Sequence, residues 1–283
     1  MYSETVQALA DQATAKLKHQ RVSLLSHLVR SMLAGMYVGA SIVLILTIGA
    51  TFSKQWPGAV RFIMGVSFGG ALTLVIFAGS ELFTGSNLIL TLGVLTGKSR
   101  PSELAANWIW TWIGNLLGSV LVAFLVVQSG LLDADPVKSF VLNVVTTKMH
   151  IAPVALIIRG ILANWLVCLA VWMAARTKSD TAKIILIFWC MFTFITSGYE
   201  HSVANMTGLM LGVLLPHGSD ISLAGYAYNL GLSTLGNIIG GAVFVGAMYW
   251  IGSPAAPAAP LLESAAAEQL VPALQTALAQ GVR

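Results

Sequence analysis

The chain has 283 residues, of which 57% are hydrophobic and only 9% are charged. A soluble domain carries roughly 25% charged residues, so this composition excludes an ordinary water-soluble protein and indicates one that lies largely in lipid. The net charge of +4 is interpreted as a sign of membrane topology and not of nucleic-acid binding, because basic residues gather on the cytoplasmic side of membrane proteins.

Long runs without charge predict the membrane-spanning helices, since a helix needs roughly 17 to 25 apolar residues to cross a bilayer. Residues 1–26 precede the first such run. Four runs have the length of one span: 31–53, 104–132, 151–175, which contains one charged residue, Arg159, and 229–251. Two further runs, 62–97 and 184–219, are each 36 residues long. They are too long for one straight span and too short for two, so each is predicted to be a span interrupted by irregular backbone.

Each interrupted run contains one carboxylate, Glu81 in the first and Glu200 in the second, close to a glycine. Irregular backbone is tolerated at membrane depth only where it is buried in protein or lines a cavity. The breaks are therefore predicted to point inward, with both carboxylates accepting hydrogen bonds from freed backbone N–H groups. His201 follows Glu200 directly. It is the one histidine expected at this depth, and an ionisable residue there is by default a functional candidate.

The basic residues predict the orientation of the chain. With six spans, ten of the 15 Lys and Arg residues fall on one side and five on the other. The richer side is expected to be cytoplasmic, which places both termini inside. Residues 1–26 alternate apolar and basic positions and are predicted to form an amphipathic segment on the inner membrane surface. A channel domain is predicted over 27–252, and the Ala- and Pro-rich residues 253–283 are predicted to be a flexible cytoplasmic tail.

An internal repeat relates the two halves of the chain. The pattern Gly-Asn-x-x-Gly occurs at 114–118 and again at 236–240, an offset of 122 residues. The pattern Gly-x-Glu occurs at 79–81 and again at 198–200, an offset of 119 residues. Each half then holds three spans, so the second half enters the membrane from the opposite side. This inverted repeat is typical of transporters and channels, whose broken helices meet near the midplane.

Other functional classes are less well supported by the sequence. Cys168 and Cys190 lie in apolar runs and are interpreted as buried hydrophobic residues, not as a disulfide. A membrane redox enzyme would need paired haem-ligating histidines or a metal cluster, and His201 has no such partner, so no enzyme activity, cofactor or metal site is predicted. A pore for gases or other neutral solutes, and a purely structural membrane protein, stay open as alternatives at this point.

Three motifs carry a resemblance to a known family: GSELFTG at 79–85, GILANWLVCLAVWMA at 160–174 and SGYEHSVANMT at 197–207. Over about residues 20–250 the chain resembles the formate/nitrite transporter family, and within it the nitrite channels. The resemblance implies an all-α integral membrane protein of the bacterial inner membrane. It further implies an aquaporin-like fold of six helices, with the second and fifth broken, and a homopentamer in which each protomer has its own pore.

The resemblance also implies a function and a set of site residues. The central pore residues would be His201, Thr84 and Asn164. The hydrophobic constrictions would be formed by Phe68, Leu72, Leu82, Phe83 and Phe194. The lysine of the outer vestibule would be Lys148, with Glu200 supporting the region of the histidine. Reasoning from the charges themselves adds Glu81 as electrostatic support and predicts that Lys148, with Arg159, concentrates anions at the outer mouth. The substrate is expected to be nitrite, with formate or hydrosulfide as alternatives. Passage of the anion and passage of the neutral acid, protonated by His201, both stay open.

Overall fold

The computed structural model describes residues 2–253, which form helices and loops and no strand. The helices are α1 (Ser3–Val22), α2 (Leu24–Ser53), η1 (Pro57–Ala59), α3 (Val60–Ser67), α4 (Gly70–Phe77), α5 (Phe83–Leu95), α6 (Pro101–Gln128), α7 (Val137–Met149), α8 (Pro153–Ala175), α9 (Asp180–Ser197), α10 (Ser202–Leu214), α11 (Leu223–Gly241), η2 (Ala242–Ala247) and α12 (Met248–Ile251). Residues 254–283, most of the predicted tail, lie outside the described residues.

Six segments within residues 2–253 are long and apolar enough to cross a membrane. They are α2, η1 to α4, α6, α8, α9, and α11 continuing through η2 and α12. The shorter apolar helices α5 and α10 complete the second and fifth spans. The predicted architecture of six helices with a broken second and fifth is therefore confirmed.

Both breaks contain a glycine in a conformation that other residues adopt only with strain. Gly79 has φ +74° and Gly198 has φ +75°, in the left-handed region that glycine enters freely because it has no Cβ. The chain leaves α4 or α9 through this glycine, runs extended for a few residues, and re-enters a helix at Phe83 or Ser202.

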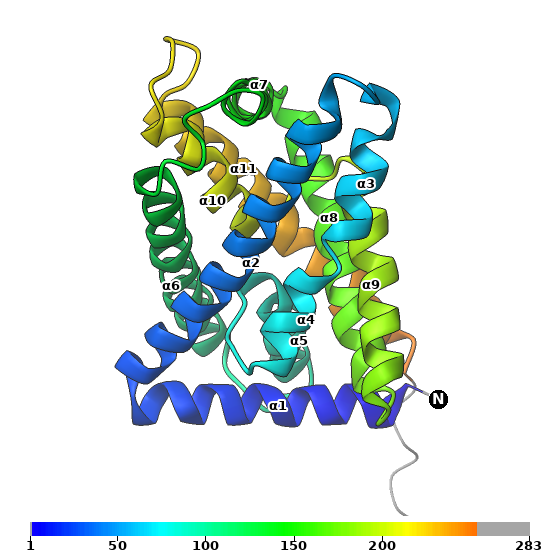
Figure 1. Cartoon of the computed structure of the whole chain (residues 1–283). Helices are drawn as coiled ribbons and strands as arrows, with labels where there is room; N and C mark the ends of the chain where they lie inside the picture. The colour runs from blue at the N-terminus through cyan, green and yellow to red at the C-terminus, as the bar shows by residue number, and fades with distance from the viewer. Residues whose placement is uncertain (1, 254–283) are drawn as a thin grey trace, which may run out of the picture.

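The inverted repeat is visible in how the helices pair. Helix α2 lies along α6 in the first half, and α8 lies along α11 in the second (Figure 1). A Cβ added at Gly118 would lie 2.0 Å from the carbonyl oxygen of Met32, and one at Gly240 would lie 2.3 Å from that of Ile161. The repeated glycines therefore mark two seams at which paired backbones touch.

Two helices lie at opposite ends of the bundle: α1 lies across one end and α7 at the other (Figure 1). Helix α1 presents Val6, Leu9, Ala13 and Leu17 to α5 and is buried along that side. Ser23 ends it, because its Oγ accepts a hydrogen bond from Ser26 N–H and caps α2. Helix α7 was not predicted, since its residues lie between two spans and are too few to cross a membrane. The cytoplasmic placement of α1 stays a prediction.

Candidate functional site

Three cavities follow one another through the molecule. A vestibule of about 460 Å³ opens at the α7 end, a vestibule of about 440 Å³ lies at the α1 end, and a central cavity of about 10 Å³ lies between them. Phe194 and His201 line both the α7-side vestibule and the central cavity. Leu72 and Leu82 line both the central cavity and the α1-side vestibule. The three cavities thus lie along one path, with the small central cavity between the two vestibules and the shared side chains at its two ends.

The central cavity is apolar apart from one side chain. It is lined by Val38, Phe68, Ala71, Leu72, Leu82, Val167, Met191, Phe194 and His201. The rings of Phe68 and Phe194 meet edge to face with centroids 5.7 Å apart. A volume of about 10 Å³ holds roughly one water molecule, so a larger solute passes only if these side chains move. Four of the five predicted constriction residues lie here, and their effect on transport stays a prediction.

His201 begins α10 and is fixed through both ring nitrogens. Its Nδ1 accepts a hydrogen bond from Ala204 N–H at 3.1 Å and so caps α10, while Nε2 lies 2.9 Å from Thr84 Oγ1. A neutral imidazole has one N–H donor and one acceptor. Because the backbone N–H occupies Nδ1, we assign the proton to Nε2, which then donates to the Thr84 hydroxyl oxygen.

Three predicted site residues lie elsewhere than expected. Thr84 is buried, lines none of the three cavities, and is connected to the central cavity through the contact of its Oγ1 with His201 Nε2. Asn164 does not line the central cavity, since its Nδ2 donates to the carbonyl oxygens of Asn237 at 2.6 Å and Thr84 at 3.3 Å and to Asn87 Oδ1 at 3.0 Å. With its donors used in this way, Asn164 joins α8 to α5 and α11. Phe83 lines none of the three cavities and packs edge-on against Trp108, with centroids 6.3 Å apart.

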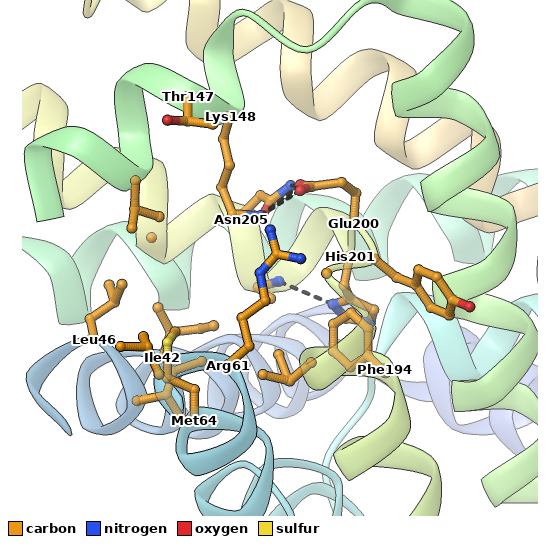
Figure 2. Close-up of a pocket in the computed structure, with 18 of the residues that line it drawn as sticks. Ile42, Leu46, Arg61, Met64, Thr147, Lys148, Phe194, Glu200, His201 and Asn205 are labelled. Carbon is orange, nitrogen blue, oxygen red and sulfur yellow. Dashed lines mark hydrogen bonds and ion pairs between the residues drawn. The ribbon is translucent and has the colours of Figure 1, made fainter. Parts of the chain in front are cut away.

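An ion pair lies at the second break, in the wall of the α7-side vestibule (Figure 2). Lys148 Nζ lies 2.7 Å from both carboxylate oxygens of Glu200, and Asn205 Nδ2 donates to Glu200 at 2.7 Å. The prediction that Glu200 accepts from freed backbone N–H groups is therefore wrong. Its oxygens are taken by the ammonium and the amide, and the freed N–H of Ser202 instead donates to Asn237 Oδ1.

The α7-side vestibule contains more positive than negative charge. Arg61 and Arg159 line it together with Lys148 and Glu200. Within residues 2–253, neither arginine is in an ion pair, whereas Lys148 is neutralised by Glu200. Sequence reasoning named Lys148 and Arg159 but missed Arg61. The available signal was its position directly before the charge-free start of the interrupted run 62–97.

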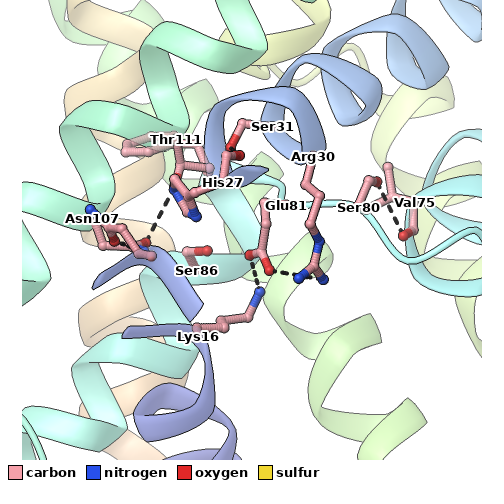
Figure 3. A network of polar contacts seen from close by, with 12 residues as sticks. Lys16, His27, Arg30, Ser31, Val75, Ser80, Glu81, Ser86, Asn107 and Thr111 are labelled. Carbon is pink, nitrogen blue, oxygen red and sulfur yellow. Dashed lines mark hydrogen bonds and ion pairs between the residues drawn. The ribbon is translucent and has the colours of Figure 1, made fainter. Parts of the chain in front are cut away.

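Glu81 at the first break has two basic partners, which correct the same prediction for this carboxylate. It forms ion pairs with Lys16 of α1 and, at 3.3 Å, with Arg30 of α2 (Figure 3). His27, in the first turn of α2, lies nearby and is also buried, with Nε2 3.0 Å from Thr111 Oγ1. Lys16 thus connects α1 directly to the first break, which lines the α1-side vestibule.

Within residues 2–253, no three His, Cys, Asp or Glu side chains converge in a metal-binding arrangement. Cys168 and Cys190 are free and buried, as predicted.

Comparison with known proteins identifies the family. The family model of the formate/nitrite transporter matches residues 3–251. The chain belongs to the formate/nitrite transporter family. It is 44% identical over 256 residues to the nitrite transporter NirC of Salmonella typhimurium, covering 90% of this chain and 93% of the relative. To the formate channel FocA of Escherichia coli it is 30% identical over 239 residues, covering 77% and 83% respectively.

Solved structures of the formate/nitrite transporter family share the fold. An FNT family ion channel superimposes with a TM-score of 0.84 at 43% identity, covering 89% of this chain and 100% of the other. A pentameric formate channel with formate bound superimposes with a TM-score of 0.73 at 27% identity, covering 82% and 98%. The resemblance found in the sequence is confirmed, and with six spans the chain is a multi-pass protein of the bacterial membrane.

Proposed function

We propose that this protein is a channel for small monovalent anions, with nitrite as its main substrate. The observation that carries the proposal is the single path on which His201 is the polar side chain of an otherwise apolar central cavity. The relatives support it, since they include nitrite transporters at 44% identity and a formate channel at 30%. Formate is therefore the second candidate, and hydrosulfide, of similar charge, is a third.

The charges and the cavity suggest how an anion crosses. Arg61 and Arg159 raise the local concentration of anions in the α7-side vestibule, because like charges in a cleft focus the potential. The anion then loses water at Phe194 and Phe68. This desolvation is costly unless hydrogen bonds replace the lost ones, and the Nε2–H of His201 supplies one when it turns from Thr84 toward the substrate.

The hydrogen bonds of His201 favour passage of the anion over a proton relay. The neutral ring has one N–H, at Nε2, so transfer of its proton to nitrite would leave an imidazolate. A relay through an imidazolium needs a proton on Nδ1 first, which removes the bond from Ala204 N–H that caps α10 and leaves that N–H without an acceptor. A neutral acid route in which His201 supplies the proton therefore requires the start of α10 to rearrange at each passage.

We further propose that the protein assembles as a homopentamer in the bacterial inner membrane, with the α1 end in the cytoplasm. A formate channel of the same fold is pentameric. Basic residues on α1 and in the loops at that end outnumber those at the α7 end, as the cytoplasmic side requires. Large apolar side chains on the outer faces of the spans, among them Leu117, Phe124 and Trp189, are exposed in the single chain and suit lipid or a neighbouring protomer. We propose that the protein transports its substrate and catalyses no reaction on it.

The proposal is tested by flux into proteoliposomes that contain the purified protein. Nitrite, formate and hydrosulfide are compared over a range of pH, and nitrite currents are recorded across planar bilayers. We expect nitrite to enter fastest and to carry current. Equal rates for the three anions would remove the preference for nitrite, and flux without current would indicate a pore for neutral species. An absence of protein-dependent flux would overturn the proposal.

A further inference from the structure

We propose that Asn237 and Asn115 are positioning residues of the pore: Asn237 fixes the backbone of His201, and Asn115 fixes the backbone of Leu82. The inference rests on the proposed channel function, because it concerns two residues that line the central cavity. The two asparagines lie outside the central cavity and hold the backbone of two residues that line it.

Asn237 binds the chain on both sides of His201. Its Oδ1 accepts the Ser202 N–H at 2.8 Å, and its Nδ2 donates to the Glu200 carbonyl at 3.0 Å. The same Nδ2 donates to the Gly160 carbonyl of α8 at 2.8 Å. One carboxamide thus holds the residue before and the residue after the histidine, and it joins both to α8.

Asn115 repeats this pattern in the first half of the chain. Its Oδ1 accepts the Phe83 N–H at 2.9 Å, and its Nδ2 donates to the Glu81 carbonyl at 2.9 Å and to the Ser31 carbonyl of α2 at 2.7 Å. The residue between Glu81 and Phe83 is Leu82, which lines the central cavity and the α1-side vestibule. Both asparagines are fully buried.

An asparagine is suited to this position because of what a break exposes. The extended backbone frees the carbonyl of the residue before His201 or Leu82 and the N–H of the residue after it, and in a membrane neither group can turn to water. A carboxamide offers an acceptor and two donors on one short, planar group. The glycine seams bring the carboxamides within reach, since the close approach of Gly240 to Ile161 O fixes α11 on α8, and that of Gly118 to Met32 O fixes α6 on α2.

The two asparagines hold different parts of the pore. Asn237 fixes the position of the backbone from which the imidazole of His201 extends. Its loss therefore lets His201 move relative to Thr84. Asn115 sets where the Leu82 side chain meets the cavity, so its loss widens or shifts the apolar wall. The pH dependence of transport should therefore depend on Asn237, and anion selectivity should depend on both.

The experiment compares Asn237→Ala, Asn115→Ala and the control Asn107→Ala in proteoliposomes. Asn107 is equally buried on α6, but its Nδ2 donates to Gln20 of α1 and its Oδ1 accepts from Thr111, so neither atom binds the backbone of a break. Nitrite and nitrate uptake are measured over a range of pH with protein that elutes as the intact oligomer. Wild-type nitrite uptake is established first, since its absence would contradict the channel function itself and not the role of the asparagines.

We expect Asn237→Ala to shift the pH profile of nitrite uptake toward that of His201→Ala. Its ratio of nitrite to nitrate uptake should fall by about fivefold or more, the size of effect that the loss of a buried hydrogen bond produces. Asn115→Ala should lower this ratio while keeping the wild-type pH profile, and Asn107→Ala should keep both. A wild-type profile and ratio in Asn237→Ala would overturn the inference.

Two further measurements apply if Asn237→Ala does not assemble. Asn237→Asp has the same shape and keeps the acceptor for Ser202 N–H but loses the two donors, so we expect the same shift in a milder form. In the wild-type protein, hydrogen–deuterium exchange of the Ser202 and Phe83 amides should be as slow as in α10 and α5, although both follow extended residues. Exchange at the rate of an open loop would contradict the proposed positioning.

Discussion

The charged residues at the two breaks differ from their sequence-based interpretation in their partners, not in their importance. Glu200 and Glu81 were recognised because a carboxylate is rare at membrane depth. Lys148 was named as well, but as a residue that attracts anions. In the structure its ammonium is bound to Glu200, so we assign the attraction of anions to Arg61 and Arg159. Partners 52 residues apart for Lys148 and 65 for Lys16 meet only through the fold, so the sequence pattern could not pair them.

Replacement of Arg61 by Gln should weaken capture of nitrite without closing the path. The variant removes one positive charge from the α7-side vestibule, so we expect KM for nitrite to rise by about two- to fivefold at low ionic strength, with less effect at high salt. Initial rates in proteoliposomes at two salt concentrations measure this. Lys54→Gln is the control, because Lys54 is exposed and does not line the vestibule. An unchanged KM for Arg61→Gln would show that this arginine attracts no substrate.

Replacement of Lys148 by Met should destabilise the protein. The Glu200 carboxylate, whose side chain is 4% exposed, would lose its cationic partner, and removal of one member of a buried pair costs about 3 kcal/mol. We expect the apparent Tm of the detergent-purified protein to fall. The double variant Lys148→Met/Glu200→Gln should recover most of the loss. Equal Tm values for the single variant and the wild type would mean that the pair contributes nothing to stability.

At the scale of helices, the predictable features were those that leave a repeating or compositional mark. Spans are marked by missing charge, breaks by length and glycine, and seams by Gly-Asn-x-x-Gly, and all of these were found. Helix α7 leaves no such mark, because a short surface helix has neither the length nor the hydropathy of a span. Asn164 lies in a correctly predicted span and Phe83 begins the helix after the first break, but the direction of a side chain on a helix that is apolar on all sides cannot be deduced from periodicity.

Two glycines of α11 should respond in opposite ways to alanine. At Gly240 the new Cβ would lie 2.3 Å from the carbonyl oxygen of Ile161, so α11 and α8 must separate, at a cost of about 1 to 3 kcal/mol. At Gly231 no atom lies within 4 Å of the new Cβ, so Gly231→Ala should be neutral or stabilise the helix by up to about 1 kcal/mol. Thermal unfolding of the purified variants measures both. A Gly240→Ala variant as stable as Gly231→Ala would contradict the close seam.

At the scale of the whole molecule, each half of the chain contributes the same set of parts. A helix at one end of the bundle, α1 or α7, supplies a lysine to the carboxylate of a break, Glu81 or Glu200. A glycine seam then supplies the asparagine that holds the break. The halves differ in the residue held, which is Leu82 in one and His201 in the other. The repeat therefore builds the same set of supporting contacts in both halves. The proposed function depends on the position at which the halves differ, where one holds Leu82 and the other holds His201.

Nitrite uptake by proteoliposomes containing either the wild-type protein or Leu82→Trp tests the central claim most directly. Leu82 borders a cavity of only about 10 Å³, which a tryptophan should fill, and Gly231→Ala serves as the control for reconstitution. We predict rapid uptake by the wild type and by Gly231→Ala, with a reduction of at least about tenfold in an assembled Leu82→Trp variant, equivalent to roughly 1.4 kcal/mol in the barrier. Wild-type liposomes no faster than empty ones, or a Leu82→Trp variant as fast as the wild type, would show that nitrite does not pass through this path.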